Sequence, residues 1–272
     1  MLIRSLVHAA IPHTVFVHRR MSQERQALAR RGAWLRLLPW RETVMERSTL
    51  VIFLVAALAL FVFAQLADEV MEGETHAFDE YVLLALRSST DLSDPLGPGW
   101  FEEMMRDFTA LGATAVLVTV TLAVVGFLVL TGKRQAAVMI ALCIATGILL
   151  SHGLKWGFAR PRPDLVPHGN VVYTQSFPSG HAMLSAVVYL TLGALLARVQ
   201  EAPRAKVYLL LVAGLLVMLI GASRVYLGVH WPTDVLAGWV MGAGWAILCW
   251  WVMLRVQRHN GPEGAAPARE PE

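Results

Sequence analysis

Long apolar runs separated by short polar ones dominate the chain between residues 49 and 254. Six runs are candidates to cross about 30 Å of hydrocarbon as helices: 49–67, 110–130, 136–154, 182–197, 207–223 and 235–254. None shows the sustained apolar–polar alternation of a β-strand. The pattern therefore predicts an all-α polytopic membrane protein with six transmembrane helices. The runs 182–197 and 207–223 are short for a bilayer, which predicts either functional polar ends or local thinning of the membrane.

Composition agrees with this class. Hydrophobic residues make up 56% of the 272 residues and charged residues 16%, whereas soluble domains hold about 25% charged residues. Cys143 and Cys249 both fall in apolar runs, so we expect buried thiols and no disulfide framework or zinc site.

Charge is distributed unevenly along the chain. Residues 1–48 hold nine Arg against three Glu, whereas 67–109 holds eleven acidic residues against two Arg. The positive-inside rule therefore predicts cytoplasmic termini and an extracytoplasmic acidic segment. The net charge of +3 averages two faces of opposite sign, so it does not indicate a nucleic-acid partner. The predicted parts are a basic segment 1–48 (an interfacial amphipathic helix or an unstructured tail), a six-helix domain 49–254, and a disordered cytoplasmic tail 255–272.

Three polar clusters fall at the predicted outward ends of the helices: "LKWGFARPRPDL", "PSGHAM" and "GASRVYLGVHWPTDVLAG". The first two are joined by a link longer than helix–helix connections need, which suggests function. The clusters concentrate four cations on an otherwise acidic face: Lys155, Arg160, Arg162 and Arg224. One such cation would complement a helix dipole or bind a headgroup. Four cations beside two histidines instead indicate an oxyanion pocket suited to phosphate.

The same clusters contain backbone donors and reactive groups. Ser179 and the Gly180 N–H lie at a predicted helix N-terminus, which favours an anion, and glycine allows its close approach. Asp234, in the first turn of the last helix, can reach back to His230 and orient its ring, as in a catalytic triad. His181 stands apart as an acid–base candidate. Two histidines with different partners suit a two-step displacement.

These residues resemble the type 2 phosphatidic acid phosphatase family, in its bacterial six-helix form, which is the membrane branch of a superfamily containing acid phosphatases and vanadium haloperoxidases. The family pattern is K-x6-RP, PSGH and SR-x5-H-x3-D. Here it reads Lys155 to Arg162-Pro163, Pro178 to His181, and Ser223-Arg224 to His230 and Asp234, with every spacing met. The resemblance covers about residues 110–254 and extends loosely to the first helix. It leaves 1–48 and 67–109 unexplained.

The resemblance implies a role for each matching position. His230 would attack phosphorus to form a phosphohistidine, oriented by Asp234, and His181 would protonate the leaving oxygen and then activate water. The phosphate-binding residues would be Lys155, Arg162, Ser179, Gly180 and Arg224, with no metal and no cofactor. Arg160 lies outside the family pattern and is expected to have a supporting part only.

The implied substrate is a membrane lipid phosphate or pyrophosphate, hydrolysed on the extracytoplasmic face of a bacterial inner membrane. Isoprenoid pyrophosphate, phosphatidylglycerol phosphate and phosphatidic acid are the candidates.

The alternative functions differ in what the site does. A phosphotransferase would use the same phosphohistidine. A transporter or binder of anionic lipids would be expected to have charges inside its helices, and these hold almost none. A haloperoxidase has no evident use for six spans. The oligomeric state stays open, because the Gly238–Gly242 pair packs helices within one chain as often as between chains.

Overall fold

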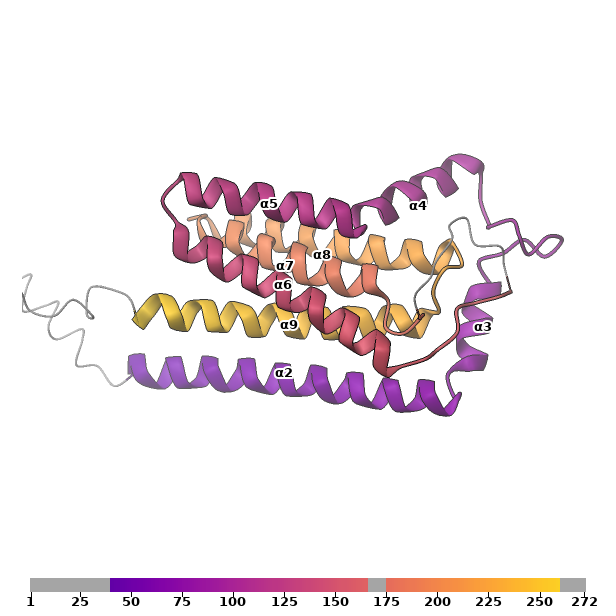
Figure 1. Ribbon diagram of the computed structural model, residues 1–272, viewed down its shortest axis with the longest axis horizontal. Coiled ribbons are helices and arrows are strands. Elements are labelled where there is room, and N and C mark those ends of the chain that lie inside the picture. The colour runs from indigo at the N-terminus through magenta and orange to yellow at the C-terminus, as the bar shows by residue number, and fades with distance from the viewer. Residues whose placement is uncertain (1–39, 166–174, 260–272) are drawn as a thin grey trace, which may run out of the picture. The chain divides into compact units, whose positions relative to one another are not determined.

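The computed structural model describes residues 40–165 and 175–259, and every contact discussed below lies within Val51–Glu272. The described residues form eight helices and no strand, with one isolated bridge between Arg87 and Pro95. The helices are α2 (Trp40–Glu72), α3 (His76–Leu84), α4 (Gly99–Leu111), α5 (Thr114–Leu130), α6 (Arg134–Gly157), α7 (Gly180–Arg198), α8 (Pro203–Tyr226) and α9 (Pro232–His259) (Figure 1). The predicted all-α class is confirmed.

The predicted membrane spans are also found. In the described part, five helices are long and apolar enough to cross a bilayer, and the count reaches six if α4 and α5, bent by 51° at a short break, form one span. The short runs 182–197 and 207–223 lie within helices of 19 and 24 residues. Each helix is longer than its apolar run because it continues into the flanking polar residues, several of which belong to the site described below.

The element boundaries differ from those expected. Helix α2 begins at Trp40, inside the segment 1–48, and α9 continues to His259, so the first residues of the predicted tail 255–272 are helical. The acidic segment 67–109 contains the end of α2, all of α3 and most of α4. Hydropathy marks the edge of the apolar layer, whereas Arg, Glu and Gln are good helix formers that carry a helix beyond it. The predictions for 1–39 and 260–272 lie outside the described residues.

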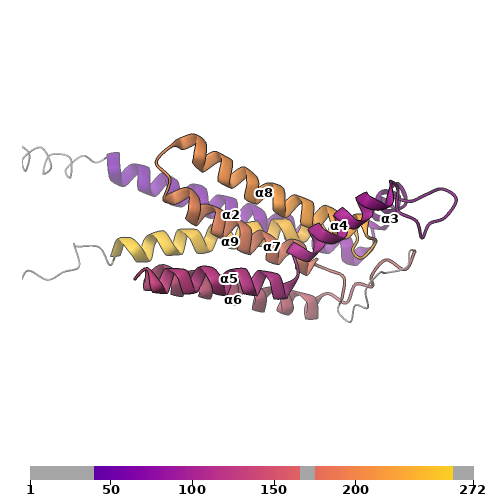
Figure 2. The ribbon, with the colours of Figure 1, turned by 90° about the horizontal axis from the view of Figure 1, so that it is seen from above.

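Helix α7 is the centre of the bundle. In its most apolar stretch 56% of the residues are buried, against 11% to 33% in the other spans. It contacts α5, α6, α8 and α9, and Figure 2 shows α5 and α6 along one side of the bundle with α8 along the other. Most of α7 is therefore enclosed by neighbouring helices, and the predicted site residues Ser179, Gly180 and His181 lie at its start.

Two glycines of α9 bring it close to α7. A Cβ at Gly242 would lie 2.4 Å from the Met183 carbonyl oxygen, and one at Gly238 would lie 2.8 Å from that of Ser179. Only a residue without a side chain fits at these distances. The Gly238–Gly242 pair therefore packs two helices of the same chain. The Ser179 N–H also donates to the Asp234 carbonyl at 2.9 Å, which joins the first turns of the two helices.

Candidate active site

All eight predicted site residues gather at one end of the bundle, where α6 ends and α7 and α9 begin (Figure 1). They come from the end of α6, the segment after it, the start of α7, the last turn of α8, the turn that follows, and the start of α9: Lys155, Arg162, Ser179, Gly180, His181, Arg224, His230 and Asp234. Electrostatic interactions couple His181 to Arg224, His230, Lys155 and Arg162. The three sequence clusters therefore meet in space.

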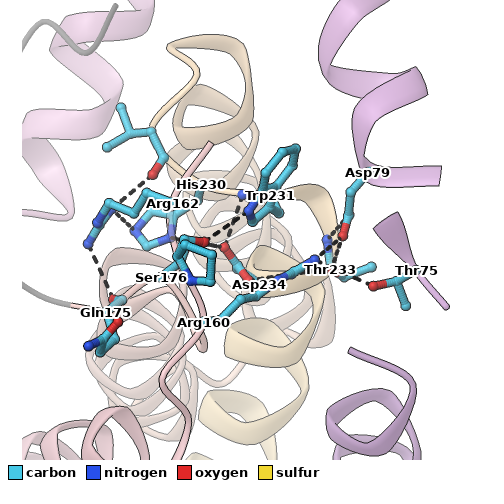
Figure 3. A network of polar contacts seen from close by, with 12 residues as sticks. Thr75, Asp79, Arg160, Arg162, Gln175, Ser176, His230, Trp231, Thr233 and Asp234 are labelled. Atoms are coloured by element: carbon cyan, nitrogen blue, oxygen red, sulfur yellow. Dashed lines mark hydrogen bonds and ion pairs between the residues drawn. The ribbon is translucent and has the colours of Figure 1, made fainter. Parts of the chain in front are cut away.

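The hydrogen bonds of His230 determine which ring nitrogen carries its proton. Nε2 lies 3.0 Å from Nη1 of Arg162, and a guanidinium only donates, so Nε2 accepts. The proton of the neutral ring is therefore on Nδ1. This atom lies 3.4 Å from Oδ2 of Asp234 and 3.4 Å from Oγ of Ser176 (Figure 3). A lone pair on Nε2 with Nδ1–H directed at a carboxylate is the arrangement of a nucleophilic or basic histidine.

Burial keeps the His230 ring neutral. The residue is 1% exposed, and desolvation lowers its pKa to about 3, with the nearby Asp234 carboxylate opposing the shift and the charges of Arg162 and Arg224 adding to it. The same cause lowers the pKa of the Arg162 guanidinium, which the Asp234 charge partly offsets. At neutral pH the imidazole therefore retains its Nε2 lone pair, while arginine stays protonated.

The Asp234 carboxylate is held from several directions. Oδ2 accepts from the Trp231 N–H at 3.0 Å and from the Ser176 hydroxyl in a short contact, and it faces His230. Oδ1 accepts from Nη1 of Arg160 at 2.7 Å. The side chain is fully buried, so these bonds offset the cost of removing its charge from water. Its orientation relative to His230 is consequently well defined.

Each of the three predicted phosphate-binding cations donates to a backbone carbonyl or a hydroxyl. Lys155 Nζ donates to the Gln175 carbonyl at 2.8 Å, and Arg162 Nη1 donates to the Val229 carbonyl at 2.8 Å. Arg224 Nη1 donates to the Thr109 hydroxyl at 2.9 Å. Each of these acceptors is neutral. These hydrogen bonds thus hold the side chains in place without neutralising their charge.

Two buried polar atoms of the predicted site make no hydrogen bond within the described part of the chain: Ser179 Oγ and Arg224 Nε. Buried donors are nearly always paired in folded proteins, so orphaned ones call for an explanation. Gly180 lies against the Lys155 side chain, since a Cβ there would be 3.4 Å from Lys155 Cε. Lys155 therefore lies beside Gly180 at the start of α7, next in sequence to the orphaned Ser179 hydroxyl.

His181 lies beside the break between α4 and α5. A Cβ at Gly112 would be 3.2 Å from Cδ2 of His181 and 2.5 Å from a methyl group of Ile220. The bend between the two helices and the absence of a side chain at Gly112 together leave room for the imidazole. Helices α4 and α5 therefore shape the surroundings of this histidine, although neither contributes a predicted site residue.

Sequence reasoning missed part of this site. Arg160, given only a supporting part, donates directly to both Asp234 and Asp79, and Asp79 was not singled out at all (Figure 3). Ser176 and Thr233 complete the network. The closeness of Ser176 to the PSGH motif was a usable signal. Asp79 carried none, because its partners lie 81 and 154 residues away in sequence.

Among residues 40–165 and 175–259, no group of three or more His, Cys, Asp or Glu side chains is arranged to hold a metal ion. The site combines the Lys155, Arg162 and Arg224 cations with the Asp234 carboxylate. By its fold, the molecule is a multi-pass membrane protein, and two histidines and a group of cations lie together at one end of its helices.

Comparison with known proteins identifies the family. The PAP2 superfamily model matches residues 136–258. The chain is 36% identical over 148 residues to phosphatidylglycerophosphatase B of Bacillus subtilis, covering 53% of this chain and 70% of that protein. It is 27% identical over 143 residues to an undecaprenyl-diphosphatase of Sulfolobus acidocaldarius, covering 51% of this chain and 60% of that one. The chain belongs to the PAP2 superfamily, and the predicted resemblance is confirmed.

A solved structure shares the fold. The crystal structure of a transmembrane PAP2-type phosphatidylglycerolphosphate phosphatase from Bacillus subtilis matches with a TM-score of 0.66 and 28% identity. The match covers 75% of this chain and 98% of that one.

Proposed function

We propose that this chain is a membrane lipid phosphatase that hydrolyses lipid phosphates or pyrophosphates at the extracytoplasmic face through a phosphohistidine on His230. The observation that carries the proposal is the state of His230. Its ring is neutral, Nδ1–H faces the Asp234 carboxylate, and the Nε2 lone pair lies beside Arg162. A neutral imidazole held in this tautomer is a competent nucleophile toward phosphorus.

The proposed reaction has two displacements. In the first, Nε2 of His230 attacks phosphorus and the bond from phosphorus to the leaving oxygen breaks, and His181 gives its proton to that oxygen. The leaving oxygen is the lipid oxygen of a lipid phosphate and the bridging oxygen of a pyrophosphate. In the second, His181 takes a proton from water, the water oxygen attacks phosphorus, and the N–P bond breaks to release phosphate. Asp234 stabilises the positive charge that the His230 ring acquires while it carries the phosphoryl group.

The phosphoryl oxygens are proposed to bind the cationic cluster. Lys155, Arg162 and Arg224 contribute positive charge, and Lys155 and Arg224 donate to neutral oxygens. The Ser179 hydroxyl and the Gly180 N–H add donors at the start of α7, where the helix dipole favours an anion. Preorganised donors of this kind stabilise the charge that develops in phosphoryl transfer.

The substrate is proposed to be a lipid because of where the cluster lies. It is at the end of helices suited to a bilayer, so a lipid brings its phosphate to the site while its chains stay in hydrocarbon. Lifting those chains into water would cost about 0.8 kcal/mol for each CH₂ group. The matched relatives are named for phosphatidylglycerophosphate and undecaprenyl diphosphate. Isoprenoid pyrophosphate, phosphatidylglycerol phosphate and phosphatidic acid are therefore the first substrates to test.

Phosphate release by the purified protein in mixed micelles tests the proposal. We expect hydrolysis of at least one of the three lipids with kcat/KM well above that for glucose 6-phosphate, and no release or phosphohistidine after His230→Asn. A higher kcat/KM for the sugar phosphate than for every lipid would contradict the proposed substrate class. Full activity of His230→Asn would contradict the mechanism.

Two further arms of the assay test the reaction type. Because fixed cations are proposed to neutralise the phosphoryl group, we expect activity to persist in excess EDTA, and loss of activity that Mg²⁺ restores would contradict this. A phosphotransferase would pass the phosphoryl group from His230 to another lipid or a sugar. Product analysis that finds a new phosphorylated acceptor in place of free phosphate would establish that alternative.

A further inference from the structure

Asp79 is a fully buried carboxylate outside the segment matched by the family model. It lies on α3 and accepts two bonds from Thr233, from the backbone N–H at 2.9 Å and from the hydroxyl at 2.6 Å. Thr233 immediately precedes Asp234 in the first turn of α9. The acidic segment that the family pattern leaves unexplained therefore reaches the residue next to the proposed catalytic carboxylate.

Arg160 connects Asp79 to Asp234 directly. Its Nη2 lies 2.6 Å from Oδ2 of Asp79, and its Nη1 lies 2.7 Å from Oδ1 of Asp234 (Figure 3). The side chain is 9% exposed, and both carboxylates are fully buried. A guanidinium is planar and rigid, so it sets the separation and tilt of two carboxylates bound to its two ends. We refer to Asp79, Arg160 and Asp234 as the carboxylate bridge.

The two oxygens of Asp234 have different partners. Oδ1 is held by Arg160, whereas Oδ2 is the atom that faces Nδ1 of His230 at 3.4 Å. Rotation of this carboxylate would move Oδ2 relative to the imidazole. Arg160 opposes that rotation from the side away from His230, and its guanidinium also lies 5.6 Å from the centre of the Trp231 ring.

The charges of the bridge do not cancel, since one guanidinium serves two carboxylates. If Arg160 paired with Asp234 alone, its whole charge would offset the carboxylate that must stabilise a positive His230 ring. Asp79 also binds this guanidinium, so part of its positive charge is offset by Asp79 and not by Asp234. Asp234 is then held in place and still presents negative charge to His230.

We infer that Asp79 and Arg160 are positioning residues for the reaction, acting on His230 through Asp234. The inference rests on the proposed function, because it gives a task to the nucleophile and carboxylate named there. A role limited to tethering α3 would need the bonds between Asp79 and Thr233 but would not need a guanidinium on Asp234.

The first test compares Asp79→Asn with Asp91→Asn. Asp91 is an exposed carboxylate between α3 and α4 whose side chain bonds to Ser93, so its replacement is a matched control. We expect Asp79→Asn to lower kcat and the rate of phosphohistidine formation by about 10- to 100-fold, as small displacements of reacting groups do. KM should change less than about twofold, because the phosphate-binding cations are untouched. The control should match the unaltered protein.

The second test uses Arg160. Arg160→Lys keeps a buried cation, so we expect the fold to be retained. A single ammonium cannot span two carboxylates, so we expect kcat to fall at least about 10-fold. Asp79→Asn/Arg160→Gln removes one charge of each sign. If the bridge only balances the charge of Asp79 and tethers α3, this double variant regains the kcat of the unaltered protein. We expect it to stay as impaired as Arg160→Gln, because Oδ1 of Asp234 has lost its partner.

Thermal unfolding of each variant separates lost folding from lost positioning, since kcat is expressed per folded molecule. Unchanged kcat in Asp79→Asn or in Arg160→Lys, or recovery in the double variant, would overturn the inference. Failure of the proposed function has a different signature: the unaltered protein would then form no phosphohistidine. That result would overturn both the mechanism and the inference. If the unaltered protein forms the phosphohistidine and the variants keep its kcat, the inference alone is overturned.

Discussion

His230 combines full burial with a carboxylate on one ring nitrogen and an arginine on the other. Burial alone would suppress charge on the ring, and the carboxylate partly counters this. The ring is therefore neutral before reaction, yet a negative group is in place for the moment when it becomes positive. An isolated histidine in water, which is partly protonated near neutral pH, lacks both features.

The lowered pKa of His230 predicts how stability depends on pH. The ring titrates near 6.5 in the unfolded chain and near 3 in the folded protein, so between these values the unfolded state binds the extra proton. Stability is therefore lost as pH falls from 6.5 toward 3, by at most about 1.4 kcal/mol per pH unit. We expect His230→Asn to lack this contribution, so that the unaltered protein loses stability relative to the variant below pH 6.5. Thermal unfolding in detergent from pH 8 to 5 measures it, and parallel curves would contradict the assignment.

The acid role proposed for His181 predicts a dependence on the leaving group. An aryl phosphate with an acidic phenol leaves without help, whereas an alkyl phosphate needs a proton. We expect His181→Asn to lower kcat/KM at least about 10-fold more for the alkyl substrate than for the aryl one. The control is Lys155→Met, which removes a phosphate contact common to both substrates and should affect them equally. Equal losses of kcat/KM for the two substrates in His181→Asn would contradict the acid role proposed for His181.

At the scale of elements, the site depends on how closely helices approach. Helices α7 and α9 meet through Gly238 and Gly242, and a hydrogen bond from Ser179 to the Asp234 carbonyl joins their first turns. Ser179 and Asp234 come from different helices, and this packing keeps the distance between them fixed. A change in the packing of the two helices far from the site would alter the geometry within it.

This packing predicts opposite effects for two glycine substitutions. Gly242→Ala places a methyl group 2.4 Å from the Met183 carbonyl oxygen, so we expect destabilisation by about 1–3 kcal/mol from overpacking and a loss of activity. Gly214 in α8 has nothing within 4 Å of its Cβ position, so Gly214→Ala should be neutral or stabilising by up to about 1 kcal/mol through helix propensity. Thermal unfolding of both variants checks the difference. A Gly242→Ala protein as stable as the Gly214→Ala protein would show that the contact is not tight.

For the whole molecule, the basic and acidic faces predict an orientation in the membrane. The positive-inside rule puts α3 and the carboxylate bridge outside the cell and the start of α6 inside. In a background with Cys143→Ala and Cys249→Ala, we expect an impermeant maleimide to label Ser93→Cys on intact cells. Gln135→Cys should react only after lysis; both positions are exposed. The reverse labelling would put the active site on the cytoplasmic face.

The acidic segment 67–109 has a structural role that its charge alone does not indicate. In the sequence, 67–109 stands out by its charge alone, which informs about membrane orientation. In the structure it forms α3 and most of α4, and these contribute Asp79 to the carboxylate bridge and Thr109 to Arg224. A segment outside the matched family region thus supports residues inside it.

The sequence by itself determined the class and the membrane spans, and it predicted eight site residues that the structure brings together. Apolar runs must leave water, so their lengths predict helices in a bilayer, and the three polar clusters fall at the predicted ends of those helices. The sequence also carried the signal for Ser176, which lies two residues before Pro178.

The tertiary structure decided which residues far apart in sequence form ion pairs. Nothing local marks Asp79 as a partner of Arg160, because ion pairs across 81 residues depend on how helices pack rather than on periodicity. The same holds for the tautomer of His230, which follows from the position of Arg162, and for the Gly238–Gly242 pair, which packs against α7. Local pattern predicts where a helix lies and which face is apolar. Distances between side chains on different helices arise only when the helices pack against one another, and the proposed chemistry depends on those distances.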